Sequence, residues 1–373
     1  METRNMGRTD FGHSGPLSGL SVVELGDDIA VALTGKLLGA LGAAVTRFEP
    51  ETGFASRSRA PMGPDGTSLL FTYLNNGKTI RSAASVDGGA VSLIRSAEIV
   101  IGAHQYFVSE GVEVESLSRD GKIVTAISGW GEQGPRAGDP FSDLVAQAAG
   151  GLINLVGDRD RHPLALAGNQ AAYSTGMQAF TGTMIALHHH DQTGEGQVIR
   201  TSYLETVAYL EWKGATYYQA NGVVLSRGGS SGPVILRTQD GHVAFYYRDT
   251  DWAQVVSLFS DPRLASPKFA SAAARIEHQA ELTLILSECS GTWTKEALYH
   301  AAQARGIPVG SVELISDLLS SEQYLDQRFL ESAGIPGVPS AKQPGVPFTF
   351  GGRRPRGEAM IGALKSRDGA TRE

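Results

Sequence analysis

The sequence predicts an α/β fold with a large doubly wound, Rossmann-like domain and a smaller α+β domain. Residues 20–25 form a short run rich in Val and Leu, which predicts a strand. Residues 30–41 carry apolar side chains at helical spacing, and residues 44–48 predict a second strand. A strand, a helix and a strand in quick succession make a βαβ unit, which implies a parallel sheet. The runs at 98–101 and 122–127 predict further strands of that sheet.

The composition is that of a globular protein that binds neither nucleic acid nor a membrane. Hydrophobic residues make up 41% of the chain and charged residues 19%, and the net charge is −7, without the clustered Lys and Arg that nucleic acids require. No apolar run approaches the ~20 residues that span a bilayer. Residues 1–14 are polar and contain no hydrophobic signal core. We therefore expect a cytoplasmic protein. Its single cysteine, Cys289, excludes an internal disulfide framework.

The later part of the chain predicts a change of architecture. A Gly-bearing turn at 167–169 leads into a long helix that runs to residue 190, and residues 197–200 form another strand. We further predict an aromatic-rich helix at 205–220, a Gly/Ser-rich loop at 221–233, and a hairpin at 234–245 with its turn at Asp240-Gly241. The expected organisation is a flexible N-terminus at 1–16, a large domain at 17–220, a linker loop and small α+β domain at 221–330, and a return to the large domain with a tail at 331–373.

Several short motifs occur in a fixed order from residue 17 to about residue 350. They are Leu17-Ser-Gly19, Leu41-Gly-Ala43 followed by Val45 and Glu49-Pro50, Asn75 with Lys78, Gly129-Trp-Gly-Glu-Gln-Gly-Pro135, and Asp143 with Gln147 before Gly150-Gly151. Together they resemble the class III CoA-transferases of the CaiB/BaiF type, the superfamily of formyl-CoA transferase and the 2-methylacyl-CoA racemases. The pattern continues with Trp252, Asp261-Pro-Arg263, Gly306-Ile-Pro308 and Arg328-Phe329. The resemblance implies a closing strand at 344–348, where the chain returns to the large domain, and a dimer whose two chains interlock like links.

The resemblance also implies a catalytic aspartate at the start of the long central helix. Its carboxylate would attack an acyl-CoA donor to form an acyl anhydride, then hold CoA as an aspartyl thioester before passing it to a carboxylic acid. Ala172 occupies that position here. The methyl group of alanine cannot act as a nucleophile, so we expect no catalytic residue on this chain. CoA thioesters are its expected substrates, and no bound cofactor or metal is expected.

Two further segments depart from the family pattern. The family opens its first helix with Ala-Gly-Pro, whose backbone amides face CoA, whereas this chain has Ala30-Val-Ala32. The family's Asn- and Pro-Gly-bearing CoA loop corresponds to residues 102–111, which contain neither feature. Ala30, Asn75 and Lys78 remain the candidate CoA-binding residues.

These losses predict a non-catalytic subunit of a heteromeric CoA-transferase, paired with a homologous subunit that carries the aspartate. It resembles one subunit of the heterodimeric succinyl-CoA:benzylsuccinate CoA-transferases, so succinyl-CoA is a plausible donor. Asp143 borders the active site in the family, and it could have a secondary role here, either structural or directed at the partner's site. Two alternatives stay open: a structural or regulatory paralogue that binds acyl-CoA without transfer, and an Asp-to-Ala inactivated form of a homodimeric transferase.

Two other functions have weaker support in the sequence. Racemase chemistry needs a His and an Asp as a proton-transfer pair, but residues 139–143, where the family has the histidine, contain none. The run His188-His-His190 suggests a metal site. Consecutive helical residues point about 100° apart, so the three imidazoles do not converge on one ion.

Overall fold

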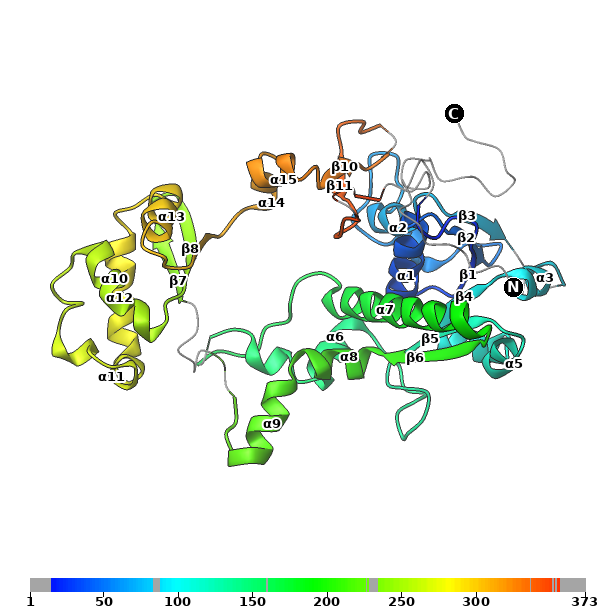
Figure 1. The fold of residues 1–373 in the computed structure, drawn as a ribbon, viewed down its shortest axis with the longest axis horizontal. Helices are drawn as coiled ribbons and strands as arrows, with labels where there is room; N and C mark the ends of the chain where they lie inside the picture. Colours follow the sequence, from blue (N-terminus) through cyan, green and yellow to red (C-terminus); the bar gives the residue numbers. More distant parts are fainter. Residues whose placement is uncertain are drawn as a thin grey trace. The chain divides into compact units, whose positions relative to one another are not determined.

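The structure is a computed structural model that describes residues 15–82, 88–158, 160–225, 227, 234–335, 337–350, 352 and 354–355. The chain divides into two compact units, Met1–Ser226 with Leu325–Glu373 and Arg227–Tyr324. The first unit contains a six-stranded sheet, and the second a three-stranded sheet with its own helices (Figure 1). Within the described residues, no helix is both long and apolar enough to cross a membrane.

The large sheet confirms the predicted α/β fold. Its strands run in the order β3-β2-β1-β4-β5-β6, and every neighbouring pair is parallel. The strands are β1 (Ser21–Leu25), β2 (Ala44–Glu49), β3 (Thr79–Ser82), β4 (Ile99–Ala103), β5 (Ile123–Ser128) and β6 (Gln197–Ser202). This is the order of doubly wound dinucleotide-binding folds, in which the connections leave β1 and β4 in opposite directions. Of the six strands, the sequence did not predict β3.

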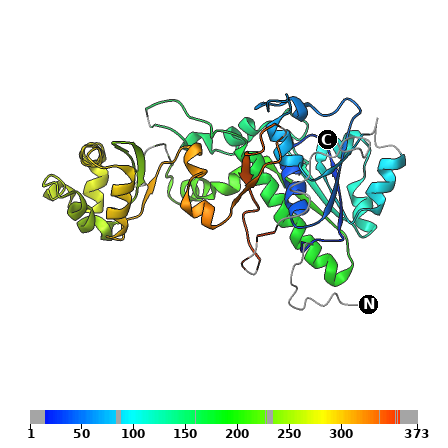
Figure 2. The ribbon, with the colours of Figure 1, turned by 90° about the horizontal axis from the view of Figure 1, so that it is seen from above.

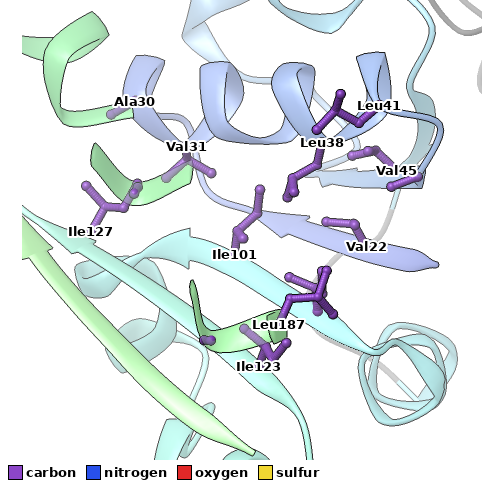
Figure 3. Close-up of a cluster of buried hydrophobic side chains, with 14 of the residues drawn as sticks. Val22, Ala30, Val31, Leu38, Leu41, Val45, Ile101, Ile123, Ile127 and Leu187 are labelled. Carbon is purple, nitrogen blue, oxygen red and sulfur yellow. The ribbon is translucent and has the colours of Figure 1, made fainter. Parts of the chain in front are cut away.

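Helices cover both faces of this sheet. On one face, α1 (Ile29–Ala40) and α7 (Gln170–Thr193) pack on side chains such as Val22, Ile101 and Ile127 (Figure 3). On the other face, α3 (Gly88–Ser96), α4 (His104–Ser109) and α5 (Val114–Arg119) pack on the alternate residues of the same strands, including Val100 and Val124. Because side chains alternate along a strand, burial of both faces explains why the central strands β1, β4 and β5 are mostly apolar.

The helices α1 and α7 approach each other closely at Gly176. A Cβ added there would lie 2.8 Å from Ala30 O and 3.0 Å from Leu33 Cβ. The Thr34 hydroxyl donates across the contact to Gly176 O at 3.1 Å. Figure 2 shows α7 (green) lying beside α1 (blue). The glycine therefore sets the spacing between the two helices, and so the position of the first turn of α7.

The rest of the first unit differs from prediction at two places. The predicted helix at 205–220 is two helices, α8 (Tyr203–Leu210) and α9 (Trp212–Asn221), which meet at Glu211. Only α8 has buried residues, Tyr203, Thr206 and Val207. Because α9 buries nothing, no packing holds it in line with α8.

The predicted closing strand at 344–348 is also wrong in its bounds. The strand there is β11 (Lys342–Pro344), paired antiparallel with β10 (Leu330–Ser332). Beyond it, Val346 packs with Ala40 and Phe348 stacks on Phe180, so hydrophobic contacts replace strand pairing. The shorter helices of this unit are α2 (Leu69–Asn75), α6 (Asp143–Ala149) and α15 (Glu322–Asp326), the last of which crosses the unit boundary.

The second unit is an α+β domain with a separate hydrophobic core. Its antiparallel sheet contains β7 (Val234–Thr238), β8 (Gly241–Phe245) and β9 (Val309–Ser311), and its helices are α10 (Trp252–Phe259), α11 (Ala272–Glu277), α12 (Gln279–Ser290), α13 (Lys295–Gln303) and α14 (Ile315–Leu318). The predicted hairpin is confirmed, but its two-residue loop is Gln239-Asp240, and Gly241 opens β8. Asp240 stays in the loop because its carboxylate accepts hydrogen bonds from Lys295 N and the Thr238 hydroxyl.

Candidate functional site

A cavity of about 630 Å³ lies at the carboxyl ends of β1, β4 and β5. Ligands of doubly wound folds bind at this edge, where the connections from two neighbouring strands leave in opposite directions and open a crevice. Its described lining comes from the turns after those strands, from the first turns of α1, α6, α7 and α8, and from β2, residues 55–59 and α2. The residues used below are Asp27, Asp28, Arg47, Arg59, Asn75, Asp143, Ala172 and Tyr203.

Ala172 lies in the first turn of α7 and lines this cavity, with 1% of its surface exposed. The amide N–H groups of a first helical turn have no partner within the helix, and Asn169 provides no side-chain cap for α7. Asp143 fills that role from α6, because its Oδ2 accepts from Ala172 N at 2.8 Å. The arrangement holds a carboxylate against the position where the family pattern places the nucleophile.

Asp143 is itself oriented by the glutamine one turn later. Its Oδ1 accepts from Gln147 Nε2 at 2.7 Å, and Gln147 Oε1 accepts from Leu166 N at 2.9 Å. The i,i+4 spacing anticipated this pair on one helix face. The pair ties α6 to the segment before α7, so the polar groups at the start of α7 are connected in one network.

Asp28 caps the start of α1, as Asp143 caps the start of α7. Its Oδ1 accepts from Ala30 N at 2.7 Å and Val31 N at 3.1 Å, and the Tyr203 hydroxyl donates to the same carboxylate at 2.9 Å. Burial raises the pKa of Asp28, although these hydrogen bonds act in the opposite direction. The amides of Ala30 and Val31, which an anionic ligand would need, are therefore already paired.

The charged groups of the cavity include more carboxylates than available cations. Asp27, Asp28 and Asp143 face two guanidinium groups. Arg47 is 1% exposed and is paired with Glu24, with Glu49 at 3.1 Å and with Asp27 at 3.2 Å. Arg59 donates to Asn169 Oδ1 at 3.1 Å. No Cys, His or Lys is among the described residues that line the cavity, so none of these can replace the missing carboxylate as nucleophile.

The two remaining candidate CoA-binding residues lie at and behind the cavity wall. Asn75 lines the cavity, and its side-chain oxygen accepts from Lys78 Nζ at 3.0 Å. Lys78 Nζ also donates to Glu24 Oε2 at 2.6 Å and to Ala32 O at 2.8 Å. Burial lowers the pKa of Lys78 to about 8. An ammonium has three N–H donors, and all three of Lys78 have partners beneath α1.

None of the described residues of two other predicted segments, the loop at 221–233 and the histidine run at 188–190, is among those that line this cavity. Of the Gly/Ser-rich loop predicted at 221–233, residues 226 and 228–233 lie outside the described residues. The three histidines near the end of α7 have separate partners: His188 contacts Gln192, His189 contacts the Glu195 carboxylate and His190 contacts the Glu195 carbonyl. Among the described residues no group of three His, Cys, Asp or Glu side chains could hold a metal ion.

The sequence analysis missed Asp28 and Tyr203 as site residues. Asp28 directly precedes the predicted helix at 30–41, which is a capping signal that could have identified it. Tyr203 has no comparable local signal, because it reaches Asp28 across a separation of 175 residues. Arg59 was missed for the same reason, since its contact with Asn169 spans 110 residues.

Comparisons with known proteins agree with the geometry. The family model described as CoA-transferase family III matches residues 17–359. The chain is 26% identical over 349 residues to the succinyl-CoA:mesaconate CoA-transferase of Haloarcula hispanica, covering 87% of each protein. It is 26% identical over 348 residues to the succinyl-CoA:(R)-benzylsuccinate CoA-transferase subunit BbsE of Thauera aromatica, covering 85% of this chain and 84% of that subunit. Among solved structures, a CaiB/BaiF family protein from Brucella suis superposes with a TM-score of 0.83 at 25% identity, covering 95% of this chain and 98% of that one.

Proposed function

The chain belongs to CoA-transferase family III, and from this premise we propose that it is the non-catalytic subunit of a heteromeric CoA-transferase. The enzyme would move CoA from an acyl-CoA donor to a carboxylic acid, with the reacting aspartate on a homologous partner subunit. The observation that carries the proposal is Ala172, which lines the cavity at the start of α7 without any side chain able to attack a thioester.

The blocked start of α1 supports this assignment independently of Ala172. Asp28 accepts the hydrogen bonds of Ala30 N and Val31 N, and an ionised carboxylate at that place repels the phosphates and carboxylate of an acyl-CoA. Restoring one aspartate would leave this obstacle in place. A transferase inactivated by a single substitution would instead keep its amides free for CoA.

The exposed aromatic surface of α9 supports the presence of a partner. None of its ten residues is buried, and Trp212, Tyr217 and Tyr218 are 55%, 43% and 62% exposed. A helix of this length is marginal without tertiary contacts, and α9 carries three large exposed aromatic side chains with no partner in its own core. We assign this surface to the contact with the catalytic subunit.

The names of the relatives point to succinyl-CoA as the donor.

Restoring a carboxylate tests the proposal against an inactivated homodimer. The variants are Ala172→Asp and, as a control of equal size without charge, Ala172→Asn. We expect both to show no CoA transfer from succinyl-CoA to a panel of dicarboxylic acids, and no aspartyl-CoA adduct by mass spectrometry of the intact protein. Robust transfer by the Ala172→Asp chain alone would identify an inactivated homodimeric enzyme and refute the proposal.

A reconstitution experiment separates a transferase subunit from a regulatory paralogue. The chain is co-purified with an Asp-bearing homologue from the same source, and transfer is measured for each protein alone and for the mixture. We expect activity only in the mixture, with the CoA adduct on the homologue. If the homologue is fully active alone and the addition of this chain changes nothing, the assignment as a transferase subunit fails.

A further inference from the structure

A second cavity, of about 450 Å³, lies beside α1 and shares no lining residue with the first. Ala172 lines the first cavity and Tyr173 lines the second, because consecutive helical residues point about 100° apart. The wall is almost entirely apolar and is built by α1, α2, α7 and the end of the chain. Its described residues are Leu33, Lys36, Leu37, Ala40, Tyr73, Tyr173, Met177, Phe329, Pro344, Gly345, Val346 and Pro347.

One charged group, the Lys36 ammonium, belongs to this apolar wall. Lys36 is 6% exposed. Its Nζ donates to Tyr73 O at 2.6 Å and lies 4.2 Å from the centre of the Tyr73 ring. Tyr73 O is the one hydrogen-bond acceptor that Lys36 has among the described residues, although an ammonium carries three N–H donors. Burial lowers the pKa of Lys36 to about 8, opposed by the field of Glu331.

Two other charged groups stand near the cavity. Glu331 acts on Lys36 through space, and its Oε1 accepts from Gln343 Nε2 at 3.4 Å. Arg354 lies behind the wall, where it donates to Val346 O and stacks over Phe329 at 5.0 Å. Arg354 Nε is buried without an acceptor among the described residues. Of these three described groups, two are cations and one is a carboxylate, so an anion would lower the excess of positive charge among them.

We propose that this cavity binds a small, largely apolar carboxylic acid, whose carboxylate accepts hydrogen bonds from the Lys36 ammonium and whose hydrocarbon part contacts Leu33, Leu37 and Met177. A charge buried in an apolar wall is costly unless it is paired, and a carboxylate supplies both the pairing charge and the missing acceptors. At about 30 Å³ for each small group, the volume admits roughly 15 non-hydrogen atoms. The site is separate from the cavity at Ala172, and the proposal does not rest on the proposed function.

The size and shape favour a small molecule over a segment of protein. Ligand pockets are concave, mostly apolar and contain a few placed polar groups within about 300–1,000 Å³, and this cavity meets each criterion. A second chain that covered the cavity would bury the Lys36 donors still further, which is unfavourable unless that chain provided a carboxylate there.

The test uses 3-phenylpropionate as the probe and 3-phenylpropanamide as its neutral analogue, with binding followed by titration calorimetry and ligand-observed NMR. The full-length chain should bind the acid saturably and more tightly than the amide. Lys36→Met should weaken binding of the acid by at least about tenfold, the value of a hydrogen bond to a charged group, and leave the amide unchanged. Met177→Trp narrows the entrance and should weaken both probes.

Lys122→Met is the matched control, because Lys122 Nζ also donates to a backbone carbonyl, Ala97 O at 2.8 Å, but does not line the cavity. It should bind the acid as the unmodified chain does, and thermal unfolding should verify that every variant is folded. The proposal is overturned if the unmodified chain shows no saturable binding, or if Lys36→Met and Lys122→Met lose equal affinity. It is also overturned if assembly with a second chain abolishes binding, because the cavity then belongs to an interface.

Discussion

At the scale of single residues, Asp28 combines two effects. Its carboxylate caps α1 through Ala30 N and Val31 N and also accepts from Tyr203, so it stabilises the helix and fixes α8 against it. Burial nevertheless raises its pKa. The folded state therefore retains the Asp28 proton at pH values where the unfolded chain has lost it. Asp28 thus closes the start of α1 to anions at some cost in stability at neutral pH.

The pH dependence of unfolding tests this interpretation of Asp28. Asn caps a helix about as well as Asp but does not titrate. Because the folded pKa is raised, the advantage of the unmodified chain over Asp28→Asn is fully present below about pH 4, the unfolded pKa, and declines as the pH rises through the folded value. Urea unfolding of both chains between pH 3 and pH 8 measures this difference.

Asp65→Asn is the comparison variant, because the pKa of Asp65 is lowered whereas the pKa of Asp28 is raised. Hydrogen bonds from the Thr67 hydroxyl and amide lower the pKa of Asp65. Its stabilising effect is present above about pH 4 and is lost as the pH falls through the folded pKa. The Asp65 difference should therefore decrease as the pH falls, whereas the Asp28 difference should decrease as the pH rises. Two parallel curves would contradict the account of Asp28.

At the scale of elements, the contact of α1 with α7 places both helix starts at the cavity. Gly176 permits the contact, because a side chain there would meet Ala30 O and Leu33. Asp28 caps α1, and Asp143 caps α7 from α6. The spacing of these two helices therefore decides how the polar groups around Ala172 are arranged, and the Thr34 hydroxyl bonds across the contact to Gly176 O.

A pair of glycine substitutions tests the importance of this spacing. Gly176→Ala should destabilise the fold by about 1–3 kcal/mol, the usual cost of overpacking a core. Gly214→Ala in α9 should instead stabilise by up to about 1 kcal/mol, because nothing lies within 4 Å of the added Cβ and alanine favours helix. Urea unfolding measures both. Equal effects of the two substitutions would mean that Gly176 does not set the helix spacing.

At the scale of the whole molecule, two compact units have separate cores. The chain leaves the first unit after α9 and returns to it at α15, where β10 and β11 and the contacts of Val346 and Phe348 complete it. This is why the second ligand cavity can be built from residues near both ends of the sequence. The aromatic side chains Trp212, Tyr217 and Tyr218 of α9 are among the large apolar groups of the first unit that its core leaves exposed.

We predict that the exposed aromatic side chains of α9 mediate assembly with the catalytic subunit. Replacing Trp212, Tyr217 and Tyr218 together with Ser should abolish the complex in native mass spectrometry while leaving the melting temperature of the chain nearly unchanged, because all three are exposed. The control replaces Ile276 and Leu284, exposed apolar residues of the second unit, and should assemble normally. Normal assembly of the α9 variant would show that these three side chains do not form the contact with the catalytic subunit.

Much of the fold could be predicted because its signals are local. The strands β1, β4 and β5 are short apolar runs, β2 and β6 contain the apolar pairs Ala44-Val45 and Val198-Ile199, and α1 has apolar residues at helical spacing. The parallel sheet follows from the succession of these elements. The pattern failed at 205–220, where one aromatic-rich stretch forms two helices. Spacing along the chain cannot reveal that only the first of them has a surface to pack against.

What the sequence alone determined is that residue 172, where the family pattern places the catalytic aspartate, is alanine whatever the fold around it. Only the tertiary structure decided which side chains meet around Ala172. Asp28 meets Tyr203 across 175 residues, and Asp143 reaches Ala172 N across 29. The second cavity joins α1, α2 and α7 to the last part of the chain. Residue types and local spacing specify which groups exist, whereas packing between distant segments determines which of those groups meet.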